Sequence, residues 1–248
     1  MSKIEAKNIE MLSKKPADAV YEQLESGIHH TPYEAETAFY NCIENGDING
    51  LEKIMESYMT QTIVVGRMSN NDLKQMQYFA VCCIALATRH AIRGGLSEIA
   101  AFNFSDECIQ AVDSMEKAGD IPVFLSEKAF ELTGLVRKSS MGKNCPEAVR
   151  KAVYYIESRL YQKISPAEVS AFCGVSKDHL NVLMKRNTGK TTGTYVTSAK
   201  LNESRRLLNR GLMLSEIAYQ LAFCSESYFV ACYKKEFGAT PRCKRNCK

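Results

Sequence analysis

Two short basic clusters with the same spacing lie near the carboxyl end of the chain. Lys185-Arg186, followed after two residues by Gly189, recurs as Lys234-Lys235 followed after two residues by Gly238. Paired cations attract phosphate groups, which gives affinity for a polyanion without choosing a sequence. A solvated basic face would produce the same pattern, so both interpretations stay open.

The charge of the whole chain shows the same asymmetry. Residues 145–248 hold 18 Lys and Arg against 8 Asp and Glu, whereas residues 1–144 hold 14 against 20. The net charge of +4 therefore combines a basic part with an acidic one. This division predicts a two-part protein whose C-terminal part meets a polyanion.

Other reactive groups lack partners at a useful spacing. Thr188-Gly-Lys-Thr191 resembles half of a phosphate-binding loop, but Met184 stands where its first glycine belongs. The four histidines form no spaced metal cluster, and Cys243-x3-Cys247 has no second ligand pair. No nucleophile has a recognisable base in the sequence. We expect no enzyme activity, no metal and no cofactor.

Cysteine content and hydropathy bear on the compartment. The chain is long enough to bury a core without a disulfide framework, so its ten cysteines are interpreted as reduced. No charged-then-apolar leader is visible, and the longest apolar run, Phe79 to Ala87, is too short for a bilayer. We expect a cytoplasmic protein with no membrane partner.

The elements that must position these residues are helices. Strand signals are scarce, and the fold class is predicted to be all-α. Thr31-Pro32-Tyr33-Glu34 is interpreted as a capping box with proline at the first helical position. A polar, glycine-containing linker is predicted at 139–145, between domains 1–138 and 146–248. Helices of the first domain are predicted at about 31–45, 47–60, 69–93, 105–117 and 121–138.

The C-terminal domain contains a repeat. Ser165-Pro166-Ala167-Glu168 is a capping box, Gly174 makes a turn and Ser176 caps the next helix, which together predict a helix-turn-helix. Glu168-Val169-Ser170 recurs as Glu216-Ile217-Ala218, and Ser176 as Ser225. Two such units, at 165–186 and 213–236, can enter successive major grooves about 34 Å apart. The helices are predicted at about 146–160, 166–173, 177–187 and 192–209, followed by the second unit.

These residues resemble the AraC/XylS family of bacterial transcription regulators. The resemblance covers about residues 146–248 and implies a seven-helix double helix-turn-helix domain that binds double-stranded DNA. It is carried by Cys173-Gly-Val-Ser176, Lys185 to Lys190, Ser215-Glu-Ile-Ala-Tyr-Gln-Leu-Ala-Phe223, Ser225-Glu-Ser-Tyr-Phe229 and Tyr233-Lys-Lys-Glu-Phe-Gly-Ala-Thr-Pro241.

The resemblance also implies residue roles. In the first recognition helix, Asp178, Asn181 and Val182 occupy positions that face base edges, with Lys177 and Lys185 beside them. An asparagine can pair with adenine, and an aspartate can accept from cytosine. The corresponding residues of the second helix are Ser225, Glu226, Ser227, Val230 and Ala231. The positions suited to phosphates or to surface charge are Arg186, Lys190, Lys234 and Lys235.

Three departures from the family pattern concern the second unit. Ala222 replaces the usual turn glycine, Met213 stands where Ser or Thr often caps a helix, and the tail lacks a tyrosine near position 244. Val230 and Ala231 offer only apolar contacts. We therefore expect the first unit to carry most of the base readout and the second to read weakly or by shape.

Residues 1–138 resemble the helical N-terminal regions of AraC-type regulators from Gram-positive bacteria. The likeness is carried by Tyr78-x10-Arg89-His-Ala-Ile-Arg-Gly-Gly95 and by Phe104-Ser-Asp-Glu-Cys-Ile109. One interpretation is a scaffold for packing or dimerisation, and Cys82-Cys83 also leaves a redox role open. The other is a sensor pocket for an anionic or polar small molecule, lined by Tyr78, Cys82, Arg89, His90 and Asp106.

Together these features predict a sequence-specific DNA-binding transcription regulator, an activator by resemblance, controlled by an effector through the N-terminal domain. The implied partners are double-stranded DNA, RNA polymerase, a small-molecule effector and a second copy of the chain. The alternative is a helical interaction module that docks on an acidic partner without reading bases.

Overall fold

A computed structural model describes residues 9–11, 30–60, 63–139 and 145–241. The chain divides into two compact units, Met1–Asn144 and Cys145–Lys248. Most of the predicted linker, residues 140–144, lies outside the described residues, as do His29 and the basic tail from Arg242 with Cys243 and Cys247. Within the described part of the chain, no helix is both long and apolar enough to cross a membrane.

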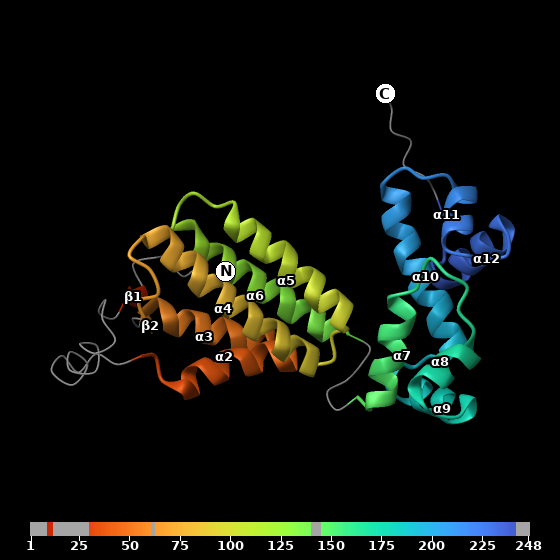
Figure 1. The fold of residues 1–248 in the computed structure, drawn as a ribbon, viewed down its shortest axis with the longest axis horizontal. Helices are drawn as coiled ribbons and strands as arrows, with labels where there is room; N and C mark the ends of the chain where they lie inside the picture. The colour runs from red at the N-terminus through yellow and green to blue at the C-terminus, as the bar shows by residue number, and fades with distance from the viewer. Residues whose placement is uncertain (1–8, 12–29, 61–62, 140–144, 242–248) are drawn as a thin grey trace. The chain divides into compact units, whose positions relative to one another are not determined.

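Helices build the N-terminal unit, as the all-α prediction requires (Figure 1). The long central helix α4 packs against α2, α5 and α6, and α3 packs against α2 and α6. Two three-residue strands, β1 and β2, pair in parallel with Ile9 opposite Ile63. The elements in chain order are β1 (Ile9–Met11), α2 (Tyr33–Asn45), α3 (Ile48–Thr60), β2 (Ile63–Val65), α4 (Asp72–Arg93), α5 (Glu98–Asp113) and α6 (Asp120–Lys138).

Two local predictions for this unit are wrong. Helix α5 begins seven residues before the predicted start at Ser105, because the Ser97 hydroxyl accepts the Ala100 amide and caps it. The capping box before α2 does not form. Pro32 is the N-cap and gives no side-chain bond, while the Thr31 hydroxyl accepts from the Val64 amide at 3.0 Å. Thr31 therefore ties the chain to β2 instead of capping α2.

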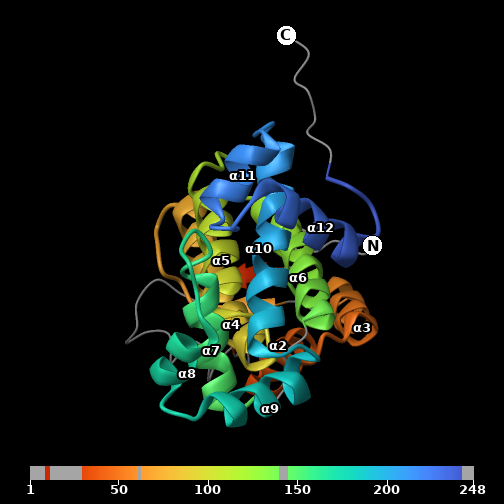
Figure 2. The same ribbon diagram turned by 90° about the vertical axis from the view of Figure 1, so that its right-hand side faces the viewer.

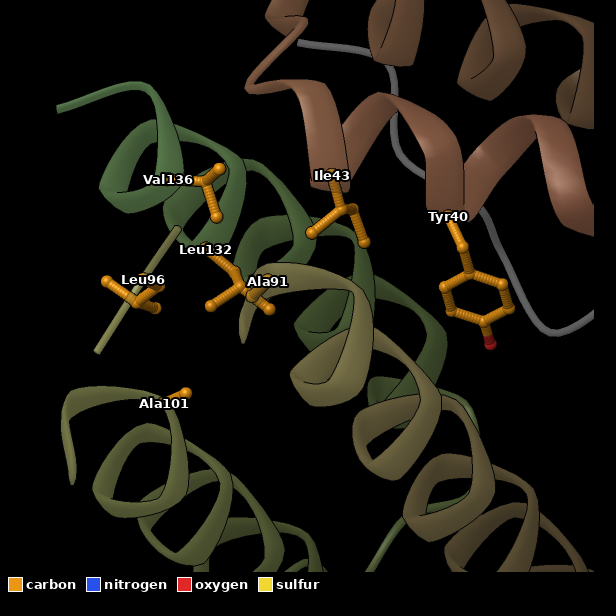
Figure 3. Packing of buried hydrophobic residues seen from close by; sticks show 7 residues of the cluster. All are labelled: Tyr40, Ile43, Ala91, Leu96, Ala101, Leu132 and Val136. Atoms are coloured by element: carbon orange, nitrogen blue, oxygen red, sulfur yellow. The ribbon is translucent and has the colours of Figure 1, made fainter. Parts of the chain in front are cut away.

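One buried cluster shows how these helices are held together (Figure 3). Gly94 closes the end of α4 against α2, since a Cβ there would lie 2.3 Å from the Glu44 carbonyl oxygen. No side chain fits at that distance, so the α4–α2 contact depends on glycine. The cluster consists of Tyr40 and Ile43 from α2, Ala91 from α4, Leu96, Ala101 from α5, and Leu132 and Val136 from α6.

The C-terminal unit is organised around α10 (Thr192–Asn209), which packs against helices of both helix-turn-helix units (Figures 1 and 2). Helices α7, α8 and α9 lie toward one end of α10, and α11 and α12 lie toward the other. These six helices, of the seven expected, fall within the described residues. The other five are α7 (Glu147–Glu157), α8 (Pro166–Cys173), α9 (Lys177–Thr188), α11 (Leu214–Gln220) and α12 (Glu226–Phe237).

Candidate nucleic-acid interface

Local capping fixes the first helix-turn-helix unit. Ser165 and Glu168 form the predicted capping box at the start of α8, with N···O distances of 3.2 and 3.0 Å. Gly174 ends α8 in the left-handed region at φ 69°. The Ser176 hydroxyl then accepts the His179 amide and starts α9. Each of these bonds joins residues of the first helix-turn-helix unit. The local sequence of that unit therefore sets the direction in which α9 leaves the turn.

The second unit repeats this backbone. Helices α9 and α12 each have 12 residues, and each ends at a left-handed glycine, Gly189 at φ 73° and Gly238 at φ 74°. Ser225 caps α12 through the Tyr228 amide at 3.1 Å. Leu180 of α9 and Phe229 of α12 occupy equivalent positions, and both are fully buried. The repeat read from the sequence is therefore a repeat of structure.

The turns of the two units are closed by equivalent bonds. In the first, the Val175 amide donates to the Ser170 carbonyl, and in the second, Phe223 donates to Ala218. The second turn has Ala222 at φ 51°, and it is the single non-glycine residue with a positive φ among the described residues. An L-residue in this region carries strain of about 1 kcal/mol or more. The departure seen in the sequence is therefore a strained backbone position.

A buried lysine joins the two helix-turn-helix units, and it is not among the site residues predicted from the sequence. Lys200 of α10 is 5% exposed. Its ammonium group donates to the carbonyl oxygen of Gln162, which precedes α8, and to that of Leu221, which ends α11, both at 2.7 Å. Burial lowers the pKa of this group. The signal in the sequence was its position on the apolar stripe of α10 beside Leu201.

A second link uses a residue that was assigned to phosphates or surface charge. The Lys190 ammonium lies 2.6 Å from a carboxylate oxygen of Glu236 in α12, and the Ser198 hydroxyl donates to the same oxygen. Hydrogen bonds from Lys190 and Ser198 lower the pKa of Glu236. The ion pair ties the loop after α9 to the end of α12. Lys190 is thus engaged within the fold.

The remaining predicted residues of α9 fall into two groups. Lys177, Asp178, Val182, Lys185 and Arg186 are exposed, with Val182 64% accessible. Together they give α9 a solvent-facing surface of mixed polarity and positive charge.

Asn181 differs from these residues because the fold already uses it. Its Oδ1 accepts the backbone amide of Thr192 at 3.1 Å, which ties α9 to the first residue of α10. The side chain is half-buried. An asparagine that pairs with adenine presents both Oδ1 and Nδ2. A base contact by Asn181 must therefore keep this internal bond or break it.

In α12, Glu226, Ser227, Ala231, Lys234 and Lys235 are exposed. Val230 is half-buried and packs against the cluster around Phe229. Ser225 is exposed, but its hydroxyl is committed to the cap. The second recognition helix thus exposes the polar side chains of Glu226, Ser227, Lys234 and Lys235.

Of the five residues predicted to line a sensor pocket, four do not line the cavity described in the N-terminal unit. Tyr78 and Asp106 are exposed, and the Arg89 guanidinium lies over the Phe102 ring, 4.9 Å from its centroid. His90 Nδ1 lies 3.0 Å from a carboxylate oxygen of Glu44, a residue with little exposure. Cys82 alone of the five lines the cavity of the N-terminal unit.

Comparison with known proteins identifies the domain type of the C-terminal unit. A helix-turn-helix domain family matches residues 169–246, which include α9 to α12 and most of α8. The right origin-binding protein of Escherichia coli is 34% identical over 96 residues. The C-terminal unit is an AraC-type DNA-binding domain.

The curated relatives are matched over part of their own length. The aligned region spans 38% of the chain and 32% of the E. coli origin-binding protein, or about a third of that relative. The HTH-type transcriptional activator Btr of Bacillus subtilis is 32% identical over 83 residues, 33% of this chain and 16% of its own length. The activator RhaS of E. coli is 23% identical over 142 residues, 55% of this chain and 51% of its own.

A solved structure matches a similar share of this chain. The transcriptional regulator of Chromobacterium violaceum with an AraC-type DNA-binding domain is 27% identical, with a TM-score of 0.37. The match covers 38% of this chain and 86% of that structure. The family assignment rests on the sequence matches.

Proposed function

We propose that the chain is a transcription regulator that binds double-stranded DNA through both recognition helices of its AraC-type domain. The observation that carries the proposal is the structural repeat: α9 and α12 share caps, length and terminal glycines. Both helices also expose basic pairs at equivalent positions. Two recognition helices on one chain can contact two major grooves on one face of a duplex.

Base readout is proposed for the exposed residues of α9. Asp178 and Val182 can contact a cytosine amino group and a thymine methyl group. In α12, Glu226 and Ser227 take the equivalent places, and Val230 is partly withdrawn into the core. Phosphate contacts fall to Lys185 and Arg186 in α9 and to Lys234 and Lys235 in α12.

Activation and effector control extend this proposal. Two relatives, Btr and RhaS, are named as transcriptional activators, which supports the same role here. The N-terminal unit, with a core and a cavity of its own, is proposed to receive the effector. RNA polymerase and a second copy of the chain are the proposed protein partners.

Selection from a pool of random duplexes with the full chain tests the DNA-binding proposal. We expect a bipartite consensus over about two helical turns, with an affinity that falls steeply as salt rises. Enrichment of no sequence, together with binding to an acidic protein through the basic unit, would favour the interaction module instead.

Two substitutions at Asn181 separate reading from packing. Asn181→Asp keeps an acceptor for the Thr192 amide but loses the donor that adenine needs, whereas Asn181→Ala loses both. If Asn181 reads a base, both variants lose preference at one base pair, at a cost of about 1–3 kcal/mol. If its role is internal, the alanine variant loses stability, the aspartate variant does not, and the selected sequence is unchanged in both.

A further inference from the structure

The N-terminal unit has a divided core. Among its described residues, buried side chains form separate clusters around Ile43, around Ile84 and around Leu51. Phe39 packs against the first and third clusters, and Phe104 packs against the first and second. Phe39 and Phe104 thus connect the three clusters.

A cavity of about 430 Å³ lies where the clusters meet. Its walls come from α2, α3, α4, α5 and α6 and from both strands, all within the N-terminal unit. Protein interiors hold few voids larger than a water molecule, and ligand pockets have volumes of about 300–1,000 Å³. The wall is predominantly apolar and includes Phe39, Met55, Ile63, Ala87, Phe104 and Ala129.

The polar groups in the wall are largely satisfied within the protein. The hydroxyl of Thr88 donates to the Ile84 carbonyl at 2.7 Å, and that of Ser126 donates to the Pro122 carbonyl at 2.8 Å. The Tyr58 hydroxyl donates to the Ala35 carbonyl at 3.2 Å. These groups offer a ligand few unengaged donors.

The wall includes the acidic side chain of Glu36, the basic one of Lys128 and the ring of His30, together with two titratable groups, Tyr40 and Cys83, whose pKa is raised. Burial, followed by the neighbouring Cys83, raises the pKa of the Tyr40 hydroxyl. Burial raises the pKa of the Cys83 thiol to about 12. Lys128, which also lines the cavity, is paired with Glu131 at 2.6 Å. An anion that entered would lose its hydration and would meet the acidic side chain of Glu36, while Lys128 is already paired.

We propose that this cavity binds a neutral, mostly apolar small molecule, rather than the anionic or polar one that the sequence suggested. The inference gives a chemical class to the effector in the proposed function. It rests on that proposal for its regulatory meaning but not for the binding itself. The lining, its volume and the satisfied hydroxyls support it.

A pair of dyes tests the inference with the full chain. N-phenyl-1-naphthylamine is neutral, and 8-anilinonaphthalene-1-sulfonate carries a sulfonate on the same aromatic skeleton. We expect the neutral dye to bind saturably, one per chain, with blue-shifted emission, and the anionic dye to bind at least about tenfold more weakly. Equal affinities, or no saturable binding of the neutral dye, would overturn the inference.

Two substitutions in α4 locate the dye. Ala87 lines the cavity, and Ala85 is exposed on the same helix and does not line it. We expect Ala87→Phe to lose dye binding and Ala85→Phe to keep it, with wild-type helical circular dichroism in both. Retention by a folded Ala87→Phe variant contradicts the site.

If Ala87→Phe does not fold, Ala129→Leu narrows the cavity from α6. Retained dye binding in this folded variant likewise overturns the site. DNA selection uses no dye, so the absence of saturable dye binding to the unsubstituted chain, with intact DNA selection, rejects this inference alone. The converse result rejects the proposed function and leaves the cavity assignment in place.

Discussion

The first turn of the AraC-type domain has Gly174 at φ 69°, and the second has Ala222 at φ 51°, although equivalent backbone bonds close both turns. A full capping box starts α8, whereas α11 has half of one: the Glu216 carboxylate accepts the Met213 amide, and Met213 returns no polar bond. The first helix-turn-helix unit therefore has a full capping box and an unstrained turn glycine. The second has the same backbone with half a capping box and a strained turn residue.

The second unit compensates with aromatic packing. Phe223 lies 5.3 Å from Phe229, Phe229 lies 5.9 Å from Tyr233, and Tyr233 lies 4.6 Å from Phe237, between ring centroids. Such aromatic pairs contribute about 0.5–1.5 kcal/mol each beyond the area they bury. Aromatic contacts, two of them between residues four apart in α12, can thus support a helix-turn-helix whose α11 cap and turn are weaker. Substitutions can test how far the two helix-turn-helix units differ.

The largest effect is expected at the shared lysine. Lys200→Met leaves two carbonyl groups without their donor, and we expect a loss of about 3 kcal/mol in the free energy of unfolding. Because Lys200 contacts both units, amide exchange should accelerate in α9 and α12 alike. Lys163→Met, at an exposed lysine, is the control. Faster exchange in one helix alone would show that the lysine supports only that unit.

The same variant has a signature in pH. The folded state binds the Lys200 proton less tightly than the unfolded state, because burial lowers its pKa. The contribution of Lys200 to the free energy of unfolding therefore rises with pH, in the alkaline window below the ordinary lysine pKa of about 10.4. Urea unfolding should show the wild-type advantage over Lys200→Met growing across that window, and a constant difference would contradict it.

The basic pairs come next in expected effect. Removal of Lys185 and Arg186, or of Lys234 and Lys235, should weaken DNA binding roughly tenfold for either pair and lower the salt slope by about 2. Fluorescence anisotropy over a salt series measures both quantities. Replacement of Lys151 and Lys163, which are exposed elsewhere in the unit, should change neither. A loss confined to the first pair would mean that α12 makes no phosphate contact.

Exchanging the turn residues should reverse their difference. Ala222→Gly relieves a positive φ and is expected to stabilise by about 1 kcal/mol. Gly174→Ala is expected to cost a similar amount, about 1 kcal/mol, because the added Cβ meets no atom within 4 Å and only the backbone strain remains. Urea unfolding measures both. Gly193→Ala, inside α10, should instead stabilise, which shows that the sign follows φ.

The smallest effect is expected at the missing cap. Met213 is 64% exposed, so replacing it loses little packing. Met213→Ser should complete the capping box with Glu216 and stabilise by about 0.5–1 kcal/mol. Ser165→Ala in the first unit should lose about 1 kcal/mol. Equal and negligible changes in the two thermal melts would mean that caps do not distinguish the units.

Local signals in the sequence identified most of this domain. Ser165, Gly174 and Ser176 act within a few residues of themselves, so their caps and turn could be read without tertiary information. The residues missed or reassigned act over a distance. Lys200 bonds to carbonyl groups 38 and 21 residues away, and Lys190 pairs with a residue 46 positions later.

The N-terminal unit was less predictable for the same reason. Its helices are predicted from the sequence, but the predicted helix start at Ser105 is wrong. The sequence does not show that Ser105 is buried within α5. The two strands are not predicted from the sequence, because three residues carry too little pattern. Their pairing, Ile9 with Ile63, also joins residues that are far apart in the sequence. The predicted pocket residues are polar and charged groups suited to an anionic or polar molecule, whereas the lining of the cavity is mostly apolar.

The pairing of β1 with β2 also has a consequence for synthesis. Ile9 leaves the ribosome 54 residues before Ile63, its partner, and a parallel pair cannot form until both strands and the helices between them are present. Both residues line the cavity. This wall is therefore completed only after α2 and α3 have emerged, and before α4, α5 and α6 supply the rest of the lining.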